Sequence, residues 1–152
     1  LLDKNEYRMT PMAELLLMFA ARAQHVEEVI KPALALGTWV VSDRFTDSSY
    51  AYQGGGRQMG SSAVAALEHQ VLGGFRPDLV IILDLDARAG LARASKVSAA
   101  DRFESEERAF FERVRASFVR RSRGPGYHLV DAARPLIDVQ AEIISIIKGL
   151  FK

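Results

Sequence analysis

The sequence predicts an α/β fold, a doubly wound parallel sheet with flanking helices. Residues 38–42, 79–83 and 127–131 form three short apolar runs of strand length. The first two runs are apolar on consecutive residues, which is typical of strands buried on both faces of a parallel sheet. Segments with helical apolar spacing separate the three runs. Strands that alternate with helices in this way form parallel sheets with right-handed crossovers.

The first helix is predicted over residues 11–36, where apolar side chains recur at spacings of three and four. Thr10 is the expected N-cap, and Gly37 is the expected stop. Pro32 lacks an N–H group, so we expect it to kink or reset the last turns.

The remaining helices are predicted over residues 62–72, 87–94, 104–121 and 135–150. Residues 43–60 form a polar connection rich in Gly, Ser, Thr and Tyr. Ligands of such folds bind at the carboxyl ends of the strands, which here carry Asp43, Asp84, Asp86 and Asp131. Asp84 and Asp86 are either outer-shell magnesium groups or ordinary polar strand ends.

Composition excludes several functional classes. The 152 residues carry 20 Lys and Arg against 19 Asp and Glu, a net charge of +1, which disfavours binding to nucleic acid polymers. There are no cysteines, so thiol catalysis and cysteine-based metal sites are excluded, and a cytoplasmic location is the default expectation. No apolar run reaches the length of a membrane span.

Residues 42–57 are the most informative segment. An acid and a base, Asp43 and Arg44, follow the first predicted strand, and hydroxyls, an amide, three glycines and Arg57 come after them. Guanidinium forks suit phosphate, and hydroxyl and amide groups suit a small polar ligand. Alternatively, Asp43 and Arg44 form a local ion pair and the glycines only make a turn.

A second candidate element lies on the first helix. Phe19 and Arg22 are i,i+3 neighbours, and Met18 and Arg22 are i,i+4 neighbours, so all three share one helical face. An apolar surface beside a guanidinium suits stacking on a base and bonding to its edge. Alternatively, Met18 and Phe19 are core residues and Arg22 extends past them to solvent.

Four ordered motifs carry a resemblance to bacterial thymidylate kinases. They are residues 14–24 (ELLLMFAARAQ), 43–45 with 48–54 (DRF, SSYAYQG), 76–79 with 83–84 (RPDL, LD) and 101–104 (DRFE). The resemblance implies a P-loop nucleoside monophosphate kinase fold, one such domain over residues 1–152, and phosphoryl transfer from ATP to dTMP, giving dTDP and ADP. It also implies a homodimer and Mg²⁺ bound with ATP.

The resemblance further implies roles for single residues. Arg22 would bond the thymine edge with Phe19 or Met18 against the ring, and Arg44 would hold the dTMP phosphate. Asp43 would hold the magnesium and its water near the transferred group. The other residues that would line the nucleoside site are Ser49, Tyr52 and Gln53, with Gln53 reading the pyrimidine edge.

Residues 95–102 would form the lid that closes over ATP. This segment is small and polar, so we expect it to be mobile without ATP. Within it only Lys96 precedes Arg102, and the bidentate phosphate contact would fall to Arg102 or to Arg93.

One departure from the family is the phosphate loop. Residues 1–152 contain no Gly-x-x-x-x-Gly-Lys-Ser/Thr, and the chain begins at Leu1, which suggests a fragment. Because that loop is central to phosphoryl transfer, the chain as printed is expected to be catalytically incomplete. The alternative function is a non-catalytic nucleotide-binding or interaction domain.

The resemblance also implies a strand order. The strand that precedes the phosphate loop would lie between residues 38–42 and 79–85, holding them about 10 Å apart. Residues 127–131 would pair on the other side of residues 79–85.

Overall fold

The computed structural model describes residues 9–94 and 106–151, and these divide into two compact units. Of the described residues, 9–76 belong to the first unit, and 77–94 and 106–151 belong to the second. The predicted lid, with Lys96 and Arg102, lies outside the described residues.

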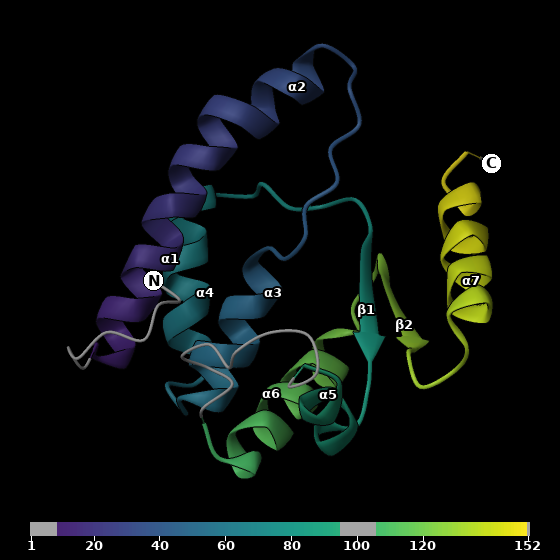
Figure 1. Ribbon diagram of the computed structural model, residues 1–152. Helices are drawn as coiled ribbons and strands as arrows, with labels where there is room; N and C mark the ends of the chain where they lie inside the picture. Colours follow the sequence, from purple (N-terminus) through teal and green to yellow (C-terminus); the bar gives the residue numbers. More distant parts are fainter. Residues whose placement is uncertain (1–8, 95–105, 152) are drawn as a thin grey trace. The chain divides into compact units, whose positions relative to one another are not determined.

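The first unit begins with one nearly continuous helical segment (Figure 1). Helix α1, Pro11–His25, starts at Thr10, whose side chain accepts a hydrogen bond from the N–H of Ala13, as predicted. A π-helical turn, Val26–Ile30, and helix α2, Lys31–Ala35, follow it. The N–H of Lys31 bonds to the carbonyl of Val26, five residues back. This wider turn lets the helix pass Pro32, so the prediction that Pro32 resets the last turns is confirmed.

The predicted strand over residues 38–42 is wrong, since this segment has no regular secondary structure and no strand partner among the described residues. Its side chains are also not doubly buried, because Trp39 is 59% and Val41 is 94% exposed. An apolar run becomes a strand only when a neighbouring strand takes up its backbone hydrogen bonds, and sequence does not report that neighbour.

The connection expected over residues 43–60 is largely helical. Helix α3, Thr46–Ser49, leads directly into a second π-helical turn, Tyr50–Gly56. Helix α4, Ser61–Leu72, then packs beside α1 (Figure 1). The core of this unit is formed by Leu15, Phe19, Val26, Ile30, Tyr50, Val64 and Leu72.

The described part of the second unit contains two parallel strands, β1, Val80–Asp84, and β2, Tyr127–Asp131. They pair in register from Val80 with Tyr127 to Asp84 with Asp131, which confirms the predicted neighbours and their direction. Full burial of the first of these strands was wrong, since Leu83 is 55% exposed.

Three helices accompany these strands among the residues of this unit that the structure describes. Helix α5 spans Ala87–Ala94, as predicted. Helix α6, Arg108–Arg121, packs on β1, and helix α7, Leu136–Gly149, packs on β2 (Figure 1). The structure therefore confirms a mixed α/β chain with a parallel sheet. The order of further strands stays a prediction.

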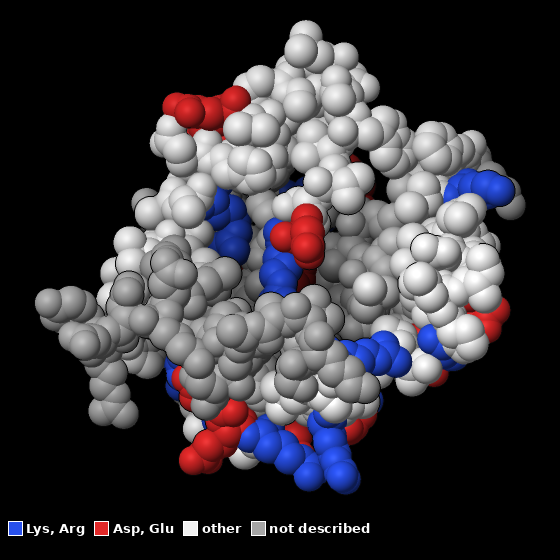
Figure 2. Space-filling model, in the orientation of Figure 1, with Lys and Arg blue, Asp and Glu red and all other residues white. Residues whose placement is uncertain are grey.

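None of the helices in the described part of the chain is long and apolar enough to cross a membrane. On the face drawn in Figure 2, basic and acidic side chains are intermingled.

Candidate functional site

The candidate site is built in the first unit, where α1 lies against the segment formed by α3 and the second π-helical turn. Arg22 contacts Phe45 at one end of this interface, and Glu14 contacts Gln53 at the other. Glu14 lies eight positions before Arg22, whereas its partner Gln53 lies eight positions after Phe45, the partner of Arg22. The two segments therefore run in opposite directions.

Arg22 is held between two aromatic rings. Its Cζ lies 4.8 Å from the centroid of Phe19 and 5.5 Å from that of Phe45, and its Nη2 donates to the Phe45 carbonyl oxygen over 3.1 Å. Phe19 is 1% exposed and belongs to the core, which confirms that it is a core residue. It also lies against the Arg22 guanidinium, as their shared helical face predicts. Met18, one residue earlier on α1, is partly buried.

The second terminal nitrogen of Arg22, Nη1, is buried without a hydrogen-bond partner in the described part of the chain. Burial lowers the pKa of the Arg22 guanidinium below its ordinary value, while the nearby carboxylates of Glu68 and Asp47 act in the opposite direction. A buried donor without a partner is costly, and a ligand oxygen that accepts from it recovers that cost. Binding of an acceptor atom by Arg22 stays a prediction.

Arg44 lies at the start of the same segment in an uncommon backbone conformation. Its φ is 77°, in the left-handed region that is costly for a residue with a side chain. The Ser42 hydroxyl donates to the Arg44 carbonyl oxygen over 2.9 Å, and the Arg44 Cζ lies 5.3 Å from the centroid of the Tyr52 ring. Asp43 beside it is exposed. The contact of Arg44 with Tyr52 is not visible in sequence, because it depends on the helical turns between them.

The second π-helical turn places Gln53 against α1. Gln53 is 2% exposed, and its Nε2 donates to Glu14 Oε1 over 2.6 Å. Ser49, one turn earlier, is 1% exposed. The predicted residues thus come together as an Arg22 group, an Arg44–Tyr52 pair and a Glu14–Gln53 pair along one interface. Their convergence on one ligand stays a prediction.

Glu14 and Glu68 belong to this site although the sequence did not assign them a role. The Tyr50 hydroxyl donates to Glu68 over 2.6 Å, and Glu14 is 1% exposed. The signal for Glu14 in the sequence is its i,i+4 spacing from Met18, which places it on the helix face that Met18 shares with Arg22.

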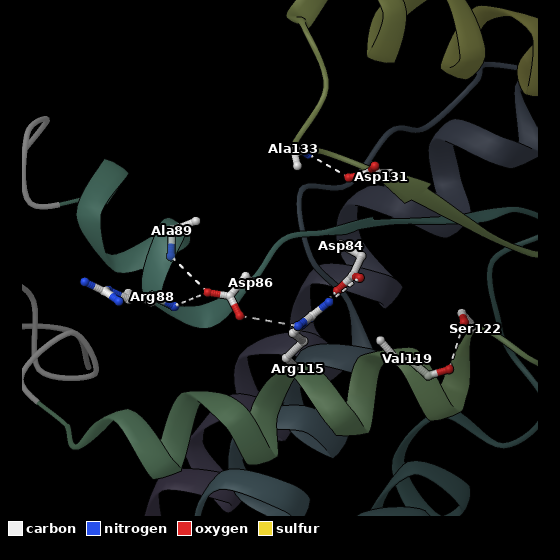
Figure 3. A network of polar contacts seen from close by, with 9 residues as sticks. All are labelled: Asp84, Asp86, Arg88, Ala89, Arg115, Val119, Ser122, Asp131 and Ala133. Atoms are coloured by element: carbon white, nitrogen blue, oxygen red, sulfur yellow. Dashed lines mark hydrogen bonds and ion pairs between the residues drawn. The ribbon is translucent and has the colours of Figure 1, made fainter.

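The carboxyl ends of β1 and β2 in the second unit carry a separate polar network (Figure 3). Arg115 on α6 donates to both oxygens of Asp84, over 2.8 and 2.9 Å, and lies 3.6 Å from Asp86. Asp86 also accepts from the N–H groups of Arg88 and Ala89 and caps α5. These contacts favour the structural interpretation of Asp84 and Asp86. Arg93, expected to contact ATP, donates to the Ala132 carbonyl over 3.0 Å.

The Asp84–Arg115 pair makes stability depend on pH. The hydrogen bond from Arg115 lowers the pKa of Asp84, so the pair stabilises the fold above the unfolded pKa of about 3.9. That stability is lost as the pH falls through the lower, folded value. Arg115 is 42% exposed, so we expect Arg115→Met to cost only about 0.5–1 kcal/mol at pH 7.

Urea unfolding of wild type and Arg115→Met between pH 2 and 7 measures this effect. The difference in the free energy of unfolding between the two proteins should disappear as the pH falls below about 4. The control variant Arg120→Met, on the same helix, should unfold like wild type at each pH. A difference that persists unchanged at pH 2 would show that the pair is not its origin.

Comparison with known proteins agrees with these motifs. A family model described as thymidylate kinase matches residues 1–143. The chain is 51% identical to a thymidylate kinase from Pseudomonas fluorescens strain SBW25, over the whole chain and 73% of that relative. It is 53% identical to a thymidylate kinase from Pseudomonas fluorescens strain Pf0-1, over 95% of the chain and 70% of that relative.

Proposed function

The chain belongs to the thymidylate kinase family, and from this premise we propose that it serves phosphoryl transfer from ATP to dTMP, giving dTDP and ADP. The structural observation that carries the proposal is Arg22, a partly buried guanidinium near two aromatic rings whose buried Nη1 has no hydrogen-bond partner among the described residues. A pyrimidine carbonyl supplies the missing acceptor, and its ring suits an aromatic neighbour. The family does not favour the alternative of a non-catalytic domain.

The acceptor nucleotide is proposed to lie along the interface of α1 with residues 43–57. Arg22 bonds the thymine edge beside Phe19 or Met18, and Gln53 reads the same edge. Arg44 holds the phosphate with its planar fork, and Ser49 and Tyr52 contribute to the nucleoside site.

Transfer through a loose transition state needs alignment and positive charge more than covalent chemistry by the protein. Arg44 supplies both for the acceptor phosphate. Arg93, Lys96 and Arg102 are proposed to neutralise the ATP phosphates, with residues 95–102 as the lid. We propose the P-loop kinase fold, with a doubly wound sheet, as the setting for these groups.

Asp43 is the residue proposed to hold Mg²⁺. In the described part of the chain no three His, Cys, Asp or Glu side chains gather as a metal cage. A single exposed carboxylate still fits Mg²⁺, which keeps several waters and takes other ligands from substrate phosphates. Bound there with ATP, the ion would neutralise charge that develops on the phosphoryl group.

Calorimetric titration of the chain with dTMP, thymidine and dCMP tests the acceptor site. We expect dTMP to bind most tightly, and equal binding of all three would overturn the proposal. For transfer, the discriminating observation is the coding DNA upstream of Leu1. An in-frame phosphate loop supports the kinase, and labelled dTDP formed from ATP and dTMP by the protein so encoded would establish it.

We also propose a cytoplasmic homodimer. Met12, Leu16 and Leu17 on α1 are between 45% and 49% exposed, and such apolar strips commonly mark association surfaces. Light scattering should give twice the mass of the chain, and Leu16→Glu should shift it toward the monomer. A monomeric wild-type mass at all concentrations would contradict the proposal.

A further inference from the structure

Glu14 is a buried carboxylate that the proposed chemistry does not use directly. It is 1% exposed on α1, and its two oxygens have different partners. Oε1 accepts from Gln53 Nε2 over 2.6 Å, and Oε2 lies 3.5 Å from Arg57 Nη2. Burying a charge is costly unless it is paired, so a glutamate in this place indicates a specific task.

The Glu14 carboxylate restricts the orientation of the Gln53 side chain. A carboxylate accepts hydrogen bonds, and both oxygens of Glu14 face donor groups, the Gln53 amide and the Arg57 guanidinium. A glutamine amide has one donor end and one acceptor end. The donor end of Gln53 must therefore face Glu14, and its carbonyl oxygen Oε1 must point away from that contact.

This orientation has a consequence for the pyrimidine edge. Thymine and uracil carry a hydrogen on N3 and donate there, whereas N3 of cytosine is an acceptor. A fixed Gln53 carbonyl therefore pairs with N3–H of thymine or uracil and faces cytosine N3 lone pair to lone pair. An amide free to turn over would offer its NH₂ group to cytosine instead.

We propose that Glu14 is a positioning residue that fixes the Gln53 amide and thereby selects thymine and uracil nucleotides over cytosine nucleotides. The inference rests on the proposed function, because it takes Gln53 as a reader of the pyrimidine edge. It assigns Glu14 no contact with the ligand. Removing its charge should change which base is preferred, beyond any general loss of affinity.

The test is titration of wild type and Glu14→Gln with dTMP, dUMP and dCMP. A glutamine at position 14 can accept or donate, so Gln53 can turn over. The ratio of dTMP to dCMP affinity should fall about tenfold, which corresponds to about 1.4 kcal/mol. If Glu14 had only a structural role, Glu14→Gln would weaken the binding of both nucleotides equally and leave this ratio unchanged.

A control variant and a double-mutant cycle extend this test. Glu27→Gln removes the same charge from an exposed i,i+4 pair with Lys31 in the neighbouring π-helical turn, and it should keep the wild-type ratio. Gln53→Ala should lower the ratio of dTMP to dCMP affinity. The double variant with Glu14→Gln should have the same ratio as Gln53→Ala alone.

The outcomes separate the two proposals. If wild type prefers dTMP and Glu14→Gln keeps that preference, the positioning role is overturned and the proposed function stands. If wild type shows no preference for dTMP, both are overturned.

A measurement on wild type keeps the proposal testable if Glu14→Gln does not fold. In the ligand-free chain, the side-chain NH₂ protons of Gln53 should exchange with solvent far more slowly than those of the exposed Gln140. Equal exchange rates for the two side chains would overturn the positioning role.

Discussion

Replacing Arg22 with alanine is expected to weaken dTMP binding by about 1–3 kcal/mol, the largest effect of any single change in the site. The guanidinium is partly desolvated, and its buried Nη1 has no partner in the part of the chain that the structure describes. A ligand acceptor therefore gains a charge-assisted hydrogen bond without a new desolvation cost on the protein side.

Arg22→Ala should change the free energy of unfolding much less than it changes the affinity for dTMP. Arg22→Ala loses the bond to the Phe45 carbonyl, but it also removes a buried N–H that lacks a protein partner. We expect the free energy of unfolding without ligand to change by no more than about 1 kcal/mol.

Calorimetry with dTMP and urea unfolding without ligand measure the two effects separately. Lys31→Ala, which removes an exposed cation farther along the same helical segment, is the matched control and should bind dTMP normally. Unchanged dTMP affinity in Arg22→Ala would refute the role of Arg22.

Replacing Arg44 with lysine is expected to reduce the preference for dTMP over thymidine by about tenfold, or about 1.4 kcal/mol. Lysine keeps the charge and tolerates the same backbone conformation as arginine, so the φ of 77° is retained. It loses the planar fork that bonds two phosphate oxygens and the stacking of that fork on Tyr52.

Thymidine serves as the internal control, because it lacks the phosphate and should bind wild type and Arg44→Lys alike. Arg123→Lys, at an exposed position in the other unit, should leave both affinities unchanged. A wild-type preference for dTMP in Arg44→Lys would assign the phosphate contact to another residue.

The sequence by itself determined the local elements with clear periodicity or strong end signals. Thr10, Pro11 and the apolar spacing set the start of α1, and Pro32 set the position of its irregular turn. The bounds of β2 and α5 were also predictable, since turn residues flank both. These features depend on neighbours within one or two turns, which sequence displays directly.

The sequence also identified the groups of the candidate site, because Arg22, Arg44 and Gln53 lie in motifs with distinctive chemistry. It did not give their arrangement. Residues 43–60 were expected to be a loop, yet α3 and the π-helical turn bring Gln53 to Glu14, 39 positions away. Only tertiary packing against α1 makes a glycine-rich segment helical, since its own propensity opposes this.

Dependence on partners distant in sequence also explains why the strand prediction for residues 38–42 is wrong and why the role of Asp84 could not be decided from sequence. An apolar run forms a strand only beside a partner, and a carboxylate at a strand end is a ligand or a salt bridge according to what lies opposite. For Asp84 the group opposite is Arg115, 31 positions away on α6. Tertiary structure decided both, because hydrogen-bond partners distant in sequence leave no mark on local residue patterns.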